Sequence, residues 1–183
     1  MALAVRGGLP ADMRWLVQEM PRDRWEGLPE IAAFWLQMHA GFRRQTTHMS
    51  AQLNRWREGA LDLKATHVSV IPVLQDFLQH LDGHHRIESG HYFPAFRRAE
   101  PRIAAGLDLL DRDHDAIHAH LDALLAGGVG LHRAVMASAG DAADHAHRLA
   151  GALEAAGPAL NRHLDDEEDI VIPLLMLKGD PLR

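Results

Sequence analysis

Residues 84–94 read HHRIESGHYFP, and this stretch combines metal-binding side chains with a helical pattern. Side chains at positions i, i+4 and i+7 lie on one face of a helix, so His84, Glu88 and His91 project in the same direction. The apolar Leu81 lies on that face too and marks it as the buried one. Because buried imidazoles and carboxylates need partners or a metal ion, the stretch predicts a metal-binding helix.

Two further segments repeat this combination of ligand and core positions. His163 and Glu167 are again four residues apart, with Leu160 on the same face. His114 and His118 are one helical turn apart on another predicted helix. A single pair of this kind is often only a surface pair, and a lone buried histidine is more often a hydrogen-bonded core residue than a ligand. The set of three pairs favours a metal centre.

The chain has 14 histidines, and not all of them are expected to bind metal. On the predicted first helix, His39 flanks the apolar stripe and His48 lies on its opposite edge, so one of the two is expected to face the site. His85 is rotated by about 100° from His84 and lies nearer the edge of the buried face. The remaining histidines are interpreted as ordinary surface or core residues: His67, His80, His120, His132, His145 and His147.

The spacing of the histidines indicates an internal repeat. His39 precedes His84 by 45 residues, and His118 precedes His163 by the same number. His84 and His163 are each followed, at offsets of 4 and 10, by a glutamate and a proline. This pattern predicts a helical hairpin used twice, which would bring two half-sites together.

Apolar periodicity predicts an all-α protein with helices over about residues 29–57, 66–98, 101–126 and 141–177. Gly127-Gly128 is expected to end the third helix, and Gly157-Pro158 to bend the fourth. Long amphipathic helices with modest loops favour an up-down-up-down antiparallel four-helix bundle. We expect residues 1–27 to form an N-terminal arm and residues 28–180 to form the bundle.

Composition excludes several other kinds of protein. The chain has no cysteine, which rules out disulfides, thiolate zinc sites and cysteine nucleophiles. The formal net charge is -6 and there is no long basic run, so no nucleic-acid partner is expected. No apolar run is long enough for a membrane span, and the first ten residues lack the apolar core of a signal peptide. We therefore expect a cytoplasmic protein with no membrane partner.

The ligand types indicate which metal the centre holds. Five imidazoles and two carboxylates exceed what one tetrahedral zinc ion uses. Carboxylates that can bridge, together with imidazoles, suit a pair of redox-active first-row ions, and iron is the natural candidate. Zinc or manganese could occupy the same ligands.

These segments resemble the hemerythrin-like, or HHE cation-binding, family over about residues 30–178. The resemblance rests on HHRIE at 84–88 with YFP at 92–94, DH at 113–114, HLDDEE at 163–168 with IP at 172–173, and MHAGFRR at 38–44. It implies an oxo- or hydroxo-bridged di-iron site in which Glu88 and Glu167 bridge the two irons. The family's ligand places fall here on His39, His84, Glu88, His114, His118, His163 and Glu167.

Two positions depart from the family pattern. Ser89 stands where the family has a second acid beside Glu88. His91 adds an imidazole that oxygen-carrying members do not need, and we include it in the predicted metal site with a hydrogen-bonding role as the equal alternative. As a ligand it would crowd the position where oxygen enters, which argues against simple oxygen transport.

Two functions are consistent with this resemblance. The first is a binding or sensing protein whose di-iron pair takes up dioxygen or nitric oxide. The second is an enzyme that reduces peroxide, oxygen or nitric oxide in stress defence. The expected partner is in either case a small diatomic molecule or peroxide. The assembly state is left open between a monomer and a homodimer.

Overall fold

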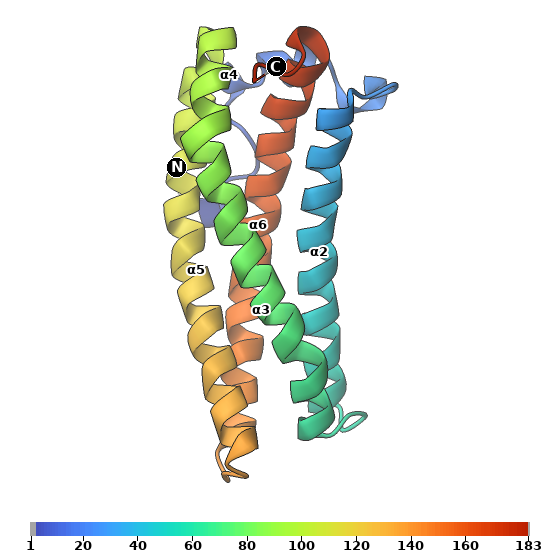
Figure 1. Ribbon diagram of the computed structural model, residues 1–183, viewed down its shortest axis with the longest axis vertical. Coiled ribbons are helices and arrows are strands. Elements are labelled where there is room, and N and C mark those ends of the chain that lie inside the picture. The colour runs from blue at the N-terminus through green and yellow to red at the C-terminus, as the bar shows by residue number, and fades with distance from the viewer. Residues whose placement is uncertain (1–2, 183) are drawn as a thin grey trace. The chain divides into compact units, whose positions relative to one another are not determined.

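The computed structural model describes residues 3–182, and helices make up most of them (Figure 1). No strand occurs among these residues, which confirms the all-α prediction and is compatible with a helical bundle. The up-down order of the bundle stays a prediction. The long helices are α2 (Glu30–Arg57), α3 (Leu63–Ile87), α5 (Ala104–Met136) and α6 (Ala142–Lys178).

The chain divides into two compact units, and each long helix contributes a segment to both. The first unit contains the chain up to Ala40, Gly83–Ala116 and the chain from Ala159 onward. The second contains Gly41–Asp82 and Ile117–Pro158. Of the predicted metal ligands, His118 alone falls in the second unit.

The N-terminal arm, residues 3–27, contains short helical turns and belongs to the first unit. Its leucines Leu9 and Leu16 are buried, and they join one core cluster with residues of α6 such as Leu174. This apolar contact holds the arm against the helices that carry the site. The turns of the arm are η1 (Leu3–Val5), η2 (Ala11–Met13), α1 (Trp15–Glu19) and η3 (Arg22–Arg24).

The second predicted helix is interrupted where the ligand-rich stretch lies. Instead of one helix over 66–98, α3 ends at Ile87 and is followed by the π-helical turn η4 (Glu88–Tyr92) and by α4 (Phe93–Ala99). The N–H of Phe93 donates to the carbonyl of Glu88, five residues earlier. Proline has no N–H to donate, and Pro94 lies two residues after the end of this turn, which favours the wider turn.

The prediction that Gly127-Gly128 ends the third helix is wrong, because α5 continues to Met136. A Cβ on Gly127 would lie 3.1 Å from the Cα of Leu149, and one on Gly128 would lie 2.4 Å from Cδ2 of Leu74. The glycines therefore allow α5 to approach α6 and α3 closely within the second unit. Helix α6 runs unbroken through Gly157-Pro158, and the bend expected there stays a prediction.

This packing predicts different outcomes for two glycine-to-alanine substitutions. Gly151 lies in α6 with open space around a Cβ, so Gly151→Ala should raise the free energy of unfolding by about 0.5–1 kcal/mol through helix propensity. Gly127→Ala should lose that gain, because its methyl group meets the backbone of Leu149. Urea unfolding of both variants checks this. An equal gain in the two would contradict the close approach.

Candidate metal centre

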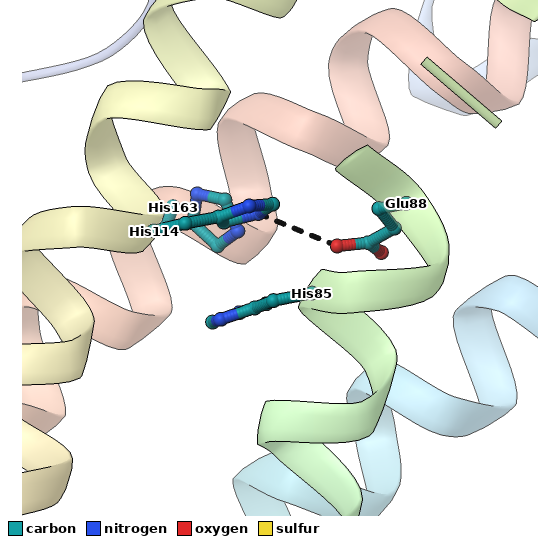
Figure 2. A group of neighbouring side chains, drawn as sticks. All are labelled: His85, Glu88, His114 and His163. Atoms are coloured by element: carbon teal, nitrogen blue, oxygen red, sulfur yellow. Dashed lines mark ion pairs between the residues drawn. The ribbon is translucent and has the colours of Figure 1, made fainter. Parts of the chain in front are cut away.

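Two groups of buried histidine and glutamate side chains lie in the first unit. In each group, one ligand atom per residue lies within 4.8 Å of the others. Glu88 belongs to both groups, so they form one continuous cluster. The first group is His85, Glu88, His114 and His163, which converge from three helical segments in Figure 2. The second group is His39, His84, Glu88 and Glu167.

The two oxygens of Glu88 contact different groups. Oε1 lies 2.6 Å from Nε2 of His84, and Oε2 lies 3.3 Å from Nε2 of His114. The Glu88 side chain is almost completely buried. A carboxylate in this position is able to bind one cation with each oxygen.

Glu167 lies between a histidine of each group in a similar way. Its Oε2 is 3.6 Å from Nε2 of His39 and 3.5 Å from Nε2 of His163. Its Oε1 accepts a hydrogen bond of 2.6 Å from the indole Nε1 of Trp35. Trp35 therefore fixes one oxygen of Glu167 and leaves the other directed at the histidines.

His85 is a cluster member that the sequence analysis missed. Its ring stacks on that of His114 with centroids 4.0 Å apart and an angle of 11° between the planes (Figure 2). His163 meets both rings edge-on, with centroids 4.8 Å from His114 and 5.4 Å from His85. Because α5 and α6 supply rings beside this face of α3, a residue at its edge is buried as well. The histidine doublet at 84–85 was the signal that could have found it.

The structure brings six of the eight predicted ligands together and leaves His91 and His118 outside the two groups. The prediction that His91 shares the buried face is wrong: His91 is exposed. The π-helical turn has more residues per turn than an α-helix. A side chain three positions after Glu88, such as that of His91, therefore no longer lies on the same face.

His118 lies one turn beyond His114 on α5, which moves it about 6 Å along the helix axis. Its side chain is 43% exposed, and its Nδ1 lies 3.9 Å from Oδ1 of Asp82 in the second unit. On α2, burial decides which of the two candidate histidines, His39 or His48, faces the site. His39 is completely buried in the second group, whereas His48 is exposed and lies 3.2 Å from the hydroxyl of Ser69.

Polar side chains lie behind three of the clustered imidazoles. Oε1 of Glu168 lies 3.1 Å from Nδ1 of His39. The hydroxyl of Ser89 lies 3.1 Å from Nδ1 of His114 and donates to Asp111 at 2.7 Å. Oδ2 of Asp113 lies 3.7 Å from Nδ1 of His163. Ser89, a departure from the family pattern, is therefore part of the surroundings of His114.

Burial changes the protonation of the cluster. It raises the pKa of Glu88 to about 8, and the nearby charge of Asp111 adds to this shift. Burial and the charge of Glu88 together raise the pKa of Glu167 to about 7. Burial lowers the pKa of His84. Metal-free protein therefore disfavours charge here, and bound cations would reverse that preference by compensating the carboxylates.

The donors present fit metal cations. Both ring nitrogens of His163 and Oε2 of Glu167 are buried and make no hydrogen bond to the part of the chain that the structure describes. Leaving such groups unsatisfied is costly, and metal coordination is one way to satisfy them. Imidazoles and carboxylates in combination suit first-row metal ions.

Fold and cluster together define a helical protein with a buried cation-binding centre. The hemerythrin HHE cation binding domain model matches residues 30–175, well over half of the chain, and the chain belongs to that family. Searches of curated proteins and of solved structures gave no significant match. Between residues 3 and 182, none of the helices has the length and apolar content that a membrane crossing requires.

The raised pKa of Glu88 predicts how the stability of metal-free protein depends on pH. Between pH 6.5 and about 8, unfolded Glu88, with an ordinary pKa of 4.5, is ionised, whereas folded Glu88 keeps its proton. Folding then takes up a proton, so the free energy of unfolding should fall as the pH rises through this window. The lowered pKa of His84 changes the free energy of unfolding in the opposite direction. That effect is confined to pH values below about 6.5, its ordinary pKa, and so lies outside this window.

Urea unfolding across this window measures the effect, with Glu88→Gln as the comparison. Glutamine mimics the protonated side chain, so the variant should lose the part of the pH dependence that Glu88 contributes and keep the part that comes from the burial of Glu167. An unchanged slope in Glu88→Gln would show that Glu88 does not titrate as described.

Proposed function

We propose that the cluster is a dinuclear metal centre that holds two iron ions. The observation that carries this proposal is the sharing of Glu88 by two buried groups of donors. Glu167, directed at one histidine of each group, is the second bridging ligand. The proposed ligands are His39, His84, His85, Glu88, His114, His163 and Glu167.

The donor set supports iron over other metals. It again contains five imidazoles and two carboxylates, with His85 in the place that the sequence analysis assigned to His118. A closed structural zinc site uses four ligands around one ion, and a shared carboxylate is not needed there. Mixed imidazole and carboxylate ligation suits redox-active iron, whereas zinc and manganese are the alternatives to test.

The function we propose is reversible binding or sensing of dioxygen or nitric oxide. The donors of the two groups would hold the iron ions, and bound iron would supply the site at which a small ligand attaches. The cluster is strongly buried. His84 is its most exposed side chain, at 11%, and this degree of burial favours a diatomic molecule over a large substrate. Bound iron would supply the electrons that such a ligand takes up.

The protein's own residues would hold the site in place and keep water out. Trp35 fixes Glu167 through its indole N–H and packs against Tyr92, with ring centroids 4.9 Å apart. Phe93 stacks on His114 on another side, with centroids 5.7 Å apart. These aromatic groups surround the donors with apolar surface, which favours neutral diatomic ligands over charged ones.

The second candidate is an enzyme that reduces peroxide, oxygen or nitric oxide. Ser89 supports it, because its hydroxyl contacts both His114 and the partly exposed Asp111. Such a chain is able to carry protons between solvent and the cluster, and reduction of these molecules consumes protons. His91, which as a ligand would have argued against simple oxygen transport, is exposed and gives the enzyme no support.

Metal analysis and gas binding test the proposal and separate the two candidates. Purified protein should contain two iron ions per chain. Anaerobically reduced protein mixed with dioxygen or nitric oxide should give a new visible absorbance that reverses on degassing. Oxidation that does not reverse, together with catalysed consumption of peroxide or nitric oxide above that by free iron, would favour the enzyme. Protein that binds no metal tightly would refute both.

The ligand assignment predicts a contrast between neighbouring histidines. Alanine at His85 should lower the metal content below two ions, because it removes a donor from the first group. The matched controls are His91→Ala, in the turn η4 that follows α3, and His118→Ala, on α5. Both should keep two ions and the wild-type spectrum. Full metal content in His85→Ala, or metal loss in either control, would contradict the assignment.

A further inference from the structure

The N-terminal arm inserts an arginine beside the first group of donors. The Arg6 side chain is completely buried, although it carries a permanent charge. Its Nη1 donates to Oδ1 of Asp113 at 3.0 Å, its Nη2 pairs with Oδ2 of the same residue, and its Nε donates to Oδ2 of Asp166 at 2.8 Å. Arg162 pairs with the other oxygen of Asp166 at 2.6 Å. Two arginines and two aspartates thus form a charge-compensated network, in which Arg162 is partly exposed and the other three are buried.

Asp113 connects this network to the cluster. Its Oδ2 faces Nδ1 of His163 at 3.7 Å, while Nε2 of the same ring faces Glu167 at 3.5 Å. Asp113 is itself buried, and Arg6 contacts both of its carboxylate oxygens. A carboxylate behind an imidazole fixes the orientation of the ring and strengthens it as a ligand. Arg6 keeps that carboxylate in place.

A second arginine of the arm has the corresponding position in the second group. Nη1 of Arg22 donates to Oε2 of Glu168 at 2.9 Å, and Oε1 of Glu168 lies 3.1 Å from Nδ1 of His39. Arg22 also donates to Asp169 at 2.7 Å and to the carbonyl of Asp165 at 2.9 Å. The arm therefore contacts one carboxylate behind an imidazole of each group.

We propose that Arg6 and Arg22 are positioning residues of the metal centre, and that docking of the arm is coupled to metal binding. The inference rests on the proposed function, because it takes His163 and His39 as ligands. Each arginine holds the carboxylate that orients one of these imidazoles. The arm is then the outer part of the centre, with one contact for each metal position.

Two consequences follow from this arrangement. Loss of a carboxylate that orients a ligand histidine typically weakens metal binding about 10- to 100-fold. Loss of Arg6 or Arg22, which only holds such a carboxylate, should weaken metal binding by about tenfold. Coupling is also reciprocal, so bound metal should hold the arm more tightly against the first unit. The arm would report the metal state of the centre at the protein surface.

Cobalt(II) titration of metal-free protein against a chelator tests the coupling. Arg22→Ala is the main variant, since its side chain is 44% exposed and its loss should leave the fold intact. Arg24→Ala, an exposed arginine two residues further along the arm, is the matched control. We expect Arg22→Ala to weaken cobalt binding at one of two positions about tenfold and to change the visible cobalt spectrum, with Arg24→Ala unchanged.

Arg6 needs a second measurement, because its removal leaves two buried aspartates with less compensation. Arg6→Lys keeps the charge but loses the paired contacts with Asp113, so it should bind cobalt more weakly than wild type and fold normally. In Arg6→Ala the rise in melting temperature on cobalt addition should be smaller than in wild type. A purely structural role would lower the melting temperatures of metal-free and loaded protein equally.

Trypsin digestion measures the reverse direction of the coupling. Cleavage within the arm, at Arg22 and Arg24, should be slower in cobalt-loaded than in metal-free wild type, and this protection should diminish in Arg22→Lys. If wild type binds no cobalt tightly, the proposed function fails and takes this inference with it. If wild type binds two ions while Arg22→Ala and Arg6→Lys keep its affinities and spectrum, the coupling alone is refuted.

Discussion

The buried carboxylate of Glu88 is the constraint on which the rest of the first unit depends. Each of its oxygens faces a histidine of a different group, at 2.6 and 3.3 Å. A carboxylate at this depth is costly unless cations or donors surround it. The long helices supply that environment by placing histidines around it. Stability and ligand binding therefore draw on the same side chains, and metal binding should favour the folded state.

The π-helical turn at Glu88–Tyr92 shows how local backbone geometry selects the donors. The turn begins at Glu88 itself, so residues before it keep α-helical spacing and residues after it do not. His84 and His85 stay directed into the unit, and His91 turns to the surface. A π-helical turn of this kind is often found at functional sites, because it changes which side chains face inward without breaking the helix.

Charge compensation extends the site beyond its donors to the start of the chain. Arg6 and Arg22 come from a segment with little regular structure, yet they contact Asp113 and Glu168 behind two of the imidazoles. Apolar burial of Leu9 and Leu16 supplies the contact that brings these arginines there. The acidic run at 165–169 belongs largely to the site and its surroundings, because Asp166, Glu167 and Glu168 are buried.

The sequence alone determined the helical class, the approximate helices and six members of the cluster, because periodicity and i, i+4 spacing are local properties of a helix. It could not place His85, His91 or His118, since their burial depends on the neighbouring helices and on a change in helical turn that local spacing does not encode. The same holds for Gly127-Gly128, which resembles a helix end in sequence but permits a close helix contact in space. Only tertiary packing decided which histidines surround Glu88 and which arginines support the site, because those contacts join different helices and the arm. The contacts of Arg6 with Asp166 and of His39 with Glu167 each join residues more than a hundred positions apart.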